Sequence, residues 1–107
     1  MPDIRVLNEM TDSVGDASAL LKALSNEHRL LVLCHLAVEG ELSAGALVER
    51  VGLSQSALSQ HLAKLREQGL VAYRREAQVL FYCVEDPRAL RLLALLHELF
   101  CPDLIGN

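Results

Sequence analysis

Hydrophobic residues recur every three or four positions early in the chain, which is the spacing of one face of an α-helix. The first such set is Ala17, Leu20, Leu21 and Leu24. It predicts a helix over 16–24, preceded by a loose N-terminal arm of mixed polarity over 1–12. The pair Ser25-Asn26 interrupts the pattern and can cap a second helix, which runs through 29–36 and ends near Gly40. This second helix is apolar nearly all round, so we expect it to be the central buried helix.

Two helix starts of the same design come next. In each, a serine follows one leucine and precedes another, and the sets are Leu42-Ser43 with Leu47 and Leu53-Ser54 with Leu58. Serine is a good N-cap, and the two leucines can pack as a staple that fixes the angle at which the chain enters the helix. We predict helices over 43–50 and 54–68, with Gly52 supplying the positive φ of the turn between them. Together, 43–68 form a helix-turn-helix.

A β-hairpin and a last helix complete the pattern. Apolar runs at the edges of 71–84 indicate two strands, joined by the polar segment 74–78 at the tip. Gly69 is suited to ending the helix before them. Asp86-Pro87 then starts a helix over 86–101, with Asp as N-cap and Pro at the first helical position, and Pro102 limits it. The predicted fold is mainly α with a β-hairpin wing, a winged helix-turn-helix in one domain.

Composition agrees with a helical core, and the charge is uneven. Hydrophobic residues make up 51% of the 107 positions, but aromatic residues only 4%. The formal charge of −4 argues against nucleic-acid binding, since phosphate contacts need lysine and arginine. However, 54–78 holds four basic and two acidic side chains, so the positive excess is local and coincides with the helix-turn-helix and wing.

The helix over 54–68 carries the side chains expected of a DNA-reading surface. Its leucines fall on one face, while amides, hydroxyls and a lysine fall on the other, with His61 at the border. Glutamine can pair with adenine, serine is adaptable, and lysine meets phosphate. The predicted DNA contacts are Ser54, Gln55, Ser56, Ser59, Gln60, His61 and Lys64, with Arg74, Arg75 and Gln78 on the wing. The alternative is a merely polar surface helix.

Three stretches resemble the ArsR/SmtB family of winged-helix repressors. They are the segments 23–30, 53–62 and 65–71, whose sequences are ALSNEHRL, LSQSALSQHL and LREQGLV. The resemblance implies a homodimer joined by the first and last helices, which places two recognition helices in successive major grooves of a pseudo-palindromic operator. The last helix holds more leucines than one face of a monomer core needs, and this surplus also favours a partner.

The usual metal sites of that family look absent here. The stretch 41–47 has no thiol, and Arg88 and Leu99 stand where imidazoles would be needed in the last helix. Cys34 and Cys101 instead resemble the dithiol branch of the family, which includes the biofilm-growth-associated repressor and sulfide-responsive repressors. That resemblance implies that reactive sulfur species or oxidants bridge the two thiols, and that the bridged protein releases its operator.

Other readings stay open from the sequence. Cys34, His97 and Cys101 form an alternative site for a soft metal, since His97 and Cys101 are four residues apart on one helix face. Cys83 is expected to act as a small hydrophobic residue. A thiol peroxidase or a protein-binding winged helix is disfavoured, because no Gly-rich loop or acid pair accompanies Cys34 and the recognition face is rich in Ser and Gln.

The sequence predicts neither a cofactor nor an association with membranes. No run of 18 apolar residues is present, and the N-terminus lacks the basic flank and apolar stretch of a signal peptide. We therefore expect a cytoplasmic regulator that is not an enzyme, and three cysteines in a reducing compartment do not predict a routine disulfide framework.

Overall fold

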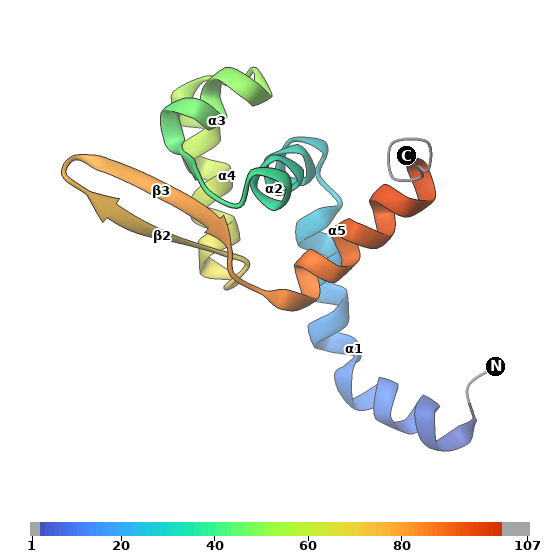
Figure 1. Ribbon diagram of the computed structural model, residues 1–107. Coiled ribbons are helices and arrows are strands. Elements are labelled where there is room, and N and C mark those ends of the chain that lie inside the picture. The colour runs from blue at the N-terminus through green and yellow to red at the C-terminus, as the bar shows by residue number, and fades with distance from the viewer. Residues whose placement is uncertain (1–2, 102–107) are drawn as a thin grey trace.

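The computed structural model describes residues 3–101, in which five helices pack together and a small sheet projects to one side of them (Figure 1). In chain order the elements are α1 (Ile4–Leu24), α2 (Glu27–Glu39), β1 (Leu42–Ser43), α3 (Ala44–Val51), α4 (Gln55–Glu67), β2 (Val71–Glu76), β3 (Val79–Val84) and α5 (Pro87–Phe100). The predicted fold class, mainly α with a β-hairpin wing, is confirmed. The position of Pro102 lies outside the described residues.

Side-chain caps define where the helices begin. Asn26 accepts a hydrogen bond from the Arg29 backbone N–H at 3.0 Å, and Asp86 accepts one from that of Arg88 at 2.8 Å. Pro87 occupies the start of α5, where its missing N–H costs nothing. Gly52 ends α3 with a φ of 70°, as the helix-turn-helix requires. The predicted starts of the second and last helices are thereby confirmed.

The first helix is much longer than the sequence pattern predicted. Asp3 caps it by accepting hydrogen bonds from the backbone N–H groups of Arg5 and Val6, at 3.0 and 3.1 Å. The prediction of a loose arm over 1–12 is therefore wrong from Ile4 onward, and residues 1 and 2 lie outside the described part of the chain. The apolar residues of this half, Ile4, Leu7, Met10 and Val14, recur at helical spacing, but each is exposed and none packs in the core.

The core is centred on α2, as its composition predicted. Val32 and Leu33 have no exposed surface, and Leu36 is 1% exposed. Leucines from α3, α4 and α5 close around this helix, together with Tyr82 of the sheet. Two apolar residues of α2 nevertheless face outward, Leu31 at 41% and Val38 at 72% exposure.

The wing is part of a three-stranded antiparallel sheet in the order β1-β3-β2. The short strand β1 pairs Leu42 with Tyr82 and was not predicted, because two residues carry no alternation to recognise. β2 and β3 pair from Val71 with Val84 to Glu76 with Val79, so only Ala77 and Gln78 form the turn. The predicted tip over 74–78 is therefore too long, and most of it is strand.

Candidate nucleic-acid interface and thiol pair

The recognition helix α4 separates its faces as predicted. Leu58, Leu62 and Leu65 are 1%, 3% and 0% exposed and anchor the helix to the core. The opposite face is solvent-exposed and comprises Gln55, Ser56, Ser59, Gln60 and Lys64. This row of amides, hydroxyls and one cation is therefore free to meet the edges of bases and the phosphates beside them.

Ser54 sets the start of α4. Its Oγ accepts a hydrogen bond from the backbone N–H of Ala57 at 3.2 Å, and the Oγ of Ser56 lies 3.4 Å away. Ser43 caps α3 in the same way, through Ala46 at 3.1 Å. The first turn of α4 is thus capped by the Ser54 hydroxyl, which lies at the surface. Ser54 is also one of the predicted DNA contacts.

His61 lies half-buried at the edge of the recognition face. Its ring is 5.8 Å from that of His28, centroid to centroid, with a tilt of 50°. Burial lowers the pKa of His61, and the positive charges of Arg29, His28 and Lys64 lower it further. The side chain is therefore mainly neutral at pH 7, where it can donate or accept a hydrogen bond.

Arg74 is exposed but paired with carboxylates of the protein, and it lies within β2 rather than at the wing tip. Its Nε and Nη2 donate to the two carboxylate oxygens of Glu41, both at 2.9 Å, and its Nη1 donates to Glu76 at 2.8 Å. The guanidinium also lies over the Phe81 ring, 4.6 Å from its centroid. These carboxylates raise the pKa of Arg74, and Arg74 in turn lowers the pKa of Glu41.

This arrangement corrects the predicted geometry of the wing. Arg74 stands in the middle of β2 and ties the wing to the segment before α3, while Gln78 is in the turn and Arg75 is exposed in β2. No local signal points to Glu41 as the partner of Arg74, because 33 positions separate the two residues. The contact of Arg75 and Gln78 with DNA stays a prediction.

All three cysteines are free thiols and half-buried. Burial raises the pKa of Cys34 in α2, and the nearby Cys101 at the end of α5 raises it further through charge repulsion. Cys34 also lines an apolar pocket of about 290 Å³ between α2 and α5, together with Leu93 and His97. Cys83 lies in β3, where it pairs with Ala72 of β2.

The alternative metal site is not formed. Within residues 3–101, no three side chains of the His, Cys, Asp and Glu types are close enough together to hold a metal ion. His97 and Cys101 are on one helix with Cys34 across from it, but the three do not converge. The thiol pair therefore lacks the third ligand that a soft-metal site would require.

In this same part of the chain, no helix has the length and apolar character needed to cross a membrane.

The comparisons with known proteins agree with one another. The family model of the bacterial regulatory proteins of the arsR family matches residues 26–73. The transcriptional activator HlyU of Vibrio cholerae serotype O1 is 50% identical over 95 residues, which cover 89% of this chain and 87% of that protein. The biofilm growth-associated repressor of Xylella fastidiosa is 40% identical, over 87% of this chain and 81% of its own.

Solved structures give the same result. A structure of reduced HlyU from Vibrio cholerae has a TM-score of 0.82 at 50% identity, covering 87% of this chain and 97% of its own. The repressor BigR from Xylella fastidiosa also has a TM-score of 0.82, at 39% identity, covering 88% of this chain and 95% of its own. These relatives are transcriptional regulators rather than enzymes. The chain therefore belongs to the ArsR family of winged-helix, DNA-binding transcriptional regulators.

Proposed function

We propose that this chain is a homodimeric repressor that releases operator DNA when Cys34 and Cys101 become bridged. The observation that carries the proposal is the pair of thiols on α2 and α5, which lie near enough for Cys101 to raise the pKa of Cys34. The relatives support repression and redox sensing by their descriptions, as a biofilm growth-associated repressor and as a reduced form of HlyU.

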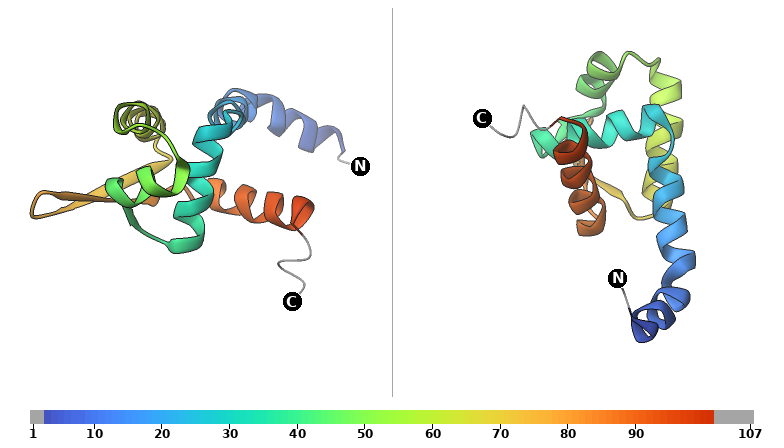
Figure 2. Two further views of the ribbon diagram at one scale, coloured as in Figure 1. Left: turned by 90° about the horizontal axis from the view of Figure 1, so that it is seen from above. Right: turned by 90° about the vertical axis from the view of Figure 1, so that its right-hand side faces the viewer.

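The packing of α1 supports the dimer. Of its 21 residues only Ala23 and Leu24 are buried, and its N-terminal half projects away from the domain (Figures 1 and 2). A helical segment as short as this projecting half is marginal in water without tertiary contacts. Exposed apolar side chains follow both α1 and the end of α5, and they include Ile4, Leu7, Met10, Val14, Leu21, Leu95, Leu99 and Phe100. A second copy that packs on α1 and α5 removes this surface from water.

Joining the two thiols into a disulfide releases two electrons, so the reaction needs a two-electron oxidant. With hydrogen peroxide, two thiols give one disulfide and two waters. With hydrogen disulfide, the two thiols of Cys34 and Cys101 give a disulfide and two molecules of hydrogen sulfide. A second equivalent of hydrogen disulfide gives a trisulfide and three molecules of hydrogen sulfide in all. In each case the attacking species is a thiolate.

A bridge between α2 and α5 acts on the operator through the fold. α2 is the buried centre against which α3 and α4 pack, whereas α5 carries part of the proposed dimer surface. A covalent link between them shifts the recognition helices relative to the dimer axis, so the spacing no longer matches successive major grooves. The affinity for a two-half-site operator then falls.

The test combines DNA binding with mass spectrometry. Fluorescence anisotropy on DNA from the promoter of the protein's own gene should show tight binding by reduced protein and release after polysulfide or peroxide. Cys34→Ser and Cys101→Ser should bind but not release, whereas Cys83→Ser serves as the matched control and should release normally. Mass spectrometry should show loss of two hydrogens, with or without added sulfur, only when both thiols are present. Release by Cys101→Ser would refute the dithiol mechanism.

A further inference from the structure

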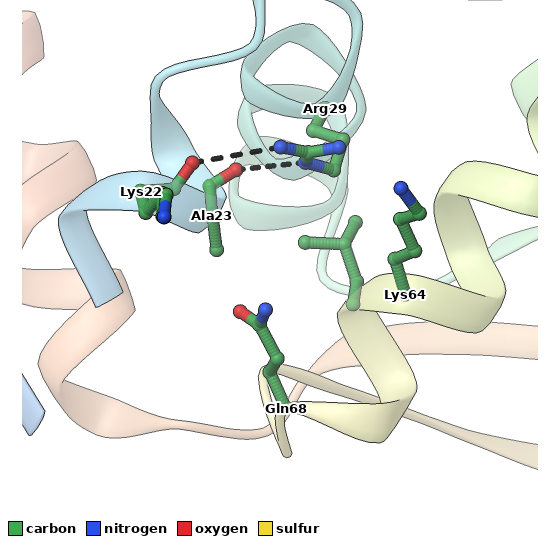
Figure 3. Close-up of a pocket in the computed structure, with 6 residues that line it drawn as sticks. Lys22, Ala23, Arg29, Lys64 and Gln68 are labelled. Atoms are coloured by element: carbon green, nitrogen blue, oxygen red, sulfur yellow. Dashed lines mark hydrogen bonds between the residues drawn. The ribbon is translucent and has the colours of Figure 1, made fainter. Parts of the chain in front are cut away.

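A second pocket, remote from the thiols, lies where α1, α2 and α4 meet. It has a volume of about 240 Å³ and is lined by Lys22, Arg29, Lys64 and Gln68, together with Ala23 and Leu65 at its floor. Each of the three cations comes from a different helix, and no carboxylate lines the pocket. Figure 3 shows Arg29 above, Lys64 rising from α4, and the amide of Gln68 facing into the space between them.

Two backbone carbonyls hold Arg29 in place. Its Nε donates to the carbonyl oxygen of Ala23 at 3.0 Å, and its Nη2 reaches that of Lys22 at 3.5 Å (Figure 3). A guanidinium has five N–H donors, so these contacts leave others available to the pocket. None of the ion pairs formed within residues 3–101 involves Lys22, Arg29 or Lys64. Their charges are therefore not neutralised by protein carboxylates.

The pKa of His61 agrees with this concentration of positive charge. Burial is the main cause of its lowered value, and the charges of Arg29, His28 and Lys64 lower it further. Like charges gathered without a counter-ion raise the free energy of the folded protein, and an anion bound among them relieves this. A planar guanidinium, two ammonium groups and an amide donor match the oxygens of a phosphate group.

The position of the pocket indicates where that phosphate comes from. Ser56, Gln60 and Lys64 are spaced four residues apart along one side of α4, and Gln68 caps the end of this helix. At a rise of about 1.5 Å per residue, Lys64 lies roughly 12 Å beyond Ser56 along the helix. That distance is about the width of the major groove. With the start of α4 in the groove, its far end therefore reaches the sugar-phosphate strand.

We propose that this pocket, formed by Lys22, Arg29, Lys64 and Gln68, binds a phosphate oxyanion, and that a backbone phosphate of the bound DNA is the group that occupies it. The assignment rests on the proposed DNA binding but concerns different residues from those that read bases. It also places part of the DNA contact on α1, so the helix that carries the proposed dimer surface contributes directly to affinity.

The first arm of the test measures the salt dependence of DNA binding. Each phosphate contact contributes about 0.9 to the slope of log K against log salt concentration. Lys22→Gln should reduce that slope by about 0.9, and should weaken operator and unrelated DNA by the same factor. Arg5→Gln is the matched control, because it removes one positive charge from the opposite end of α1, where the side chain is 86% exposed. It should leave the slope unchanged.

The second arm uses DNA-free protein and inorganic phosphate. A free oxyanion that occupies the pocket raises the melting temperature above that in chloride of equal ionic strength, and Lys22→Gln abolishes the rise. A reduced slope in the first arm supports the DNA phosphate as occupant. If the slope is unchanged but phosphate specifically stabilises the protein, DNA phosphate is refuted as the occupant, and the pocket binds a free oxyanion instead. No effect in either arm overturns the pocket itself. Failure of the wild-type protein to bind any DNA refutes the proposed function instead, and leaves the second arm informative.

Discussion

Removal of the Ser54 hydroxyl tests how the recognition helix is positioned. In the structure this Oγ accepts the Ala57 N–H at 3.2 Å, and satisfies one of the backbone donors that every helix leaves unpaired at its start. Alanine at this position cannot accept a hydrogen bond. The first turn of α4, which presents Gln55 and Ser56, should therefore fray more readily in Ser54→Ala than in the wild-type protein.

The expected cost follows from the cap alone. Loss of a serine N-cap destabilises a protein by about 1 kcal/mol. For a domain of this size that corresponds to a decrease in melting temperature of roughly 4–8 °C. The folded state should still dominate, so global unfolding does not reduce DNA binding. Local fraying competes with the docked first turn, and it can weaken operator binding by a factor of up to about five.

Urea denaturation at fixed protein concentration measures the stability, and fluorescence anisotropy measures the affinity. Ser43→Ala is the matched control, because Ser43 caps α3 through an equivalent bond of 3.1 Å but lies outside α4. It should lose similar stability and retain operator affinity. Ser54→Asn keeps a capping side chain and should regain the stability. If Ser54→Ala proves as stable as the wild type while Ser43→Ala does not, the role assigned to this cap is refuted.

Three further predictions concern the core, the thiols and the dimer. Leu33→Ala, at a side chain with no exposed surface, should lower the unfolding free energy by about 2–5 kcal/mol in urea titrations, and a loss below about 1 kcal/mol would contradict its central place. Because burial raises the pKa of Cys34 above its ordinary 9.0, its thiolate forms only at higher pH. Its alkylation by iodoacetamide, followed by mass spectrometry, should reach half its maximal rate above pH 9.0 in folded protein and near 9.0 in urea; half-maximal reaction below 9.0 in the folded state would contradict this. Met10→Glu combined with Val14→Glu, at positions 47% and 53% exposed on α1, should give monomers in sedimentation velocity, and an unchanged dimer would remove α1 from the interface.

The elements that the sequence predicted well are those whose signals are local. Ser43, Ser54 and Asp86 each cap a helix with their own side chain, and Gly52 adopts the positive φ that its place in the turn requires. The leucine stripe of α4 likewise needs only its own spacing to select a buried face. These features depend on residues a few positions apart, so they can be predicted from the local sequence.

What the sequence missed depends on distant partners. The first half of α1 has helically spaced apolar residues, but they stand among polar ones and do not pack in the core of this chain, so the sequence predicted an arm there. The two-residue strand β1 exists only through its pairing with β3. The pocket lined by Lys22 and Arg29 forms only because the ends of α1 and α2 lie next to Lys64.

Arg74 and Lys64 show why residue type alone does not assign a DNA contact. Both are exposed cations within the locally basic segment, and both were predicted to meet DNA. Arg74 is neutralised by Glu41 and Glu76, so transfer of its guanidinium to a phosphate requires breaking three hydrogen bonds of 2.8–2.9 Å and separating it from two carboxylates. Lys64 has no such partner in the described residues and releases only water and counter-ions. A positive charge on α4 and one on the wing therefore contribute unequally to DNA affinity. The slope of log K against log salt concentration should change more in Lys64→Gln than in Arg74→Gln.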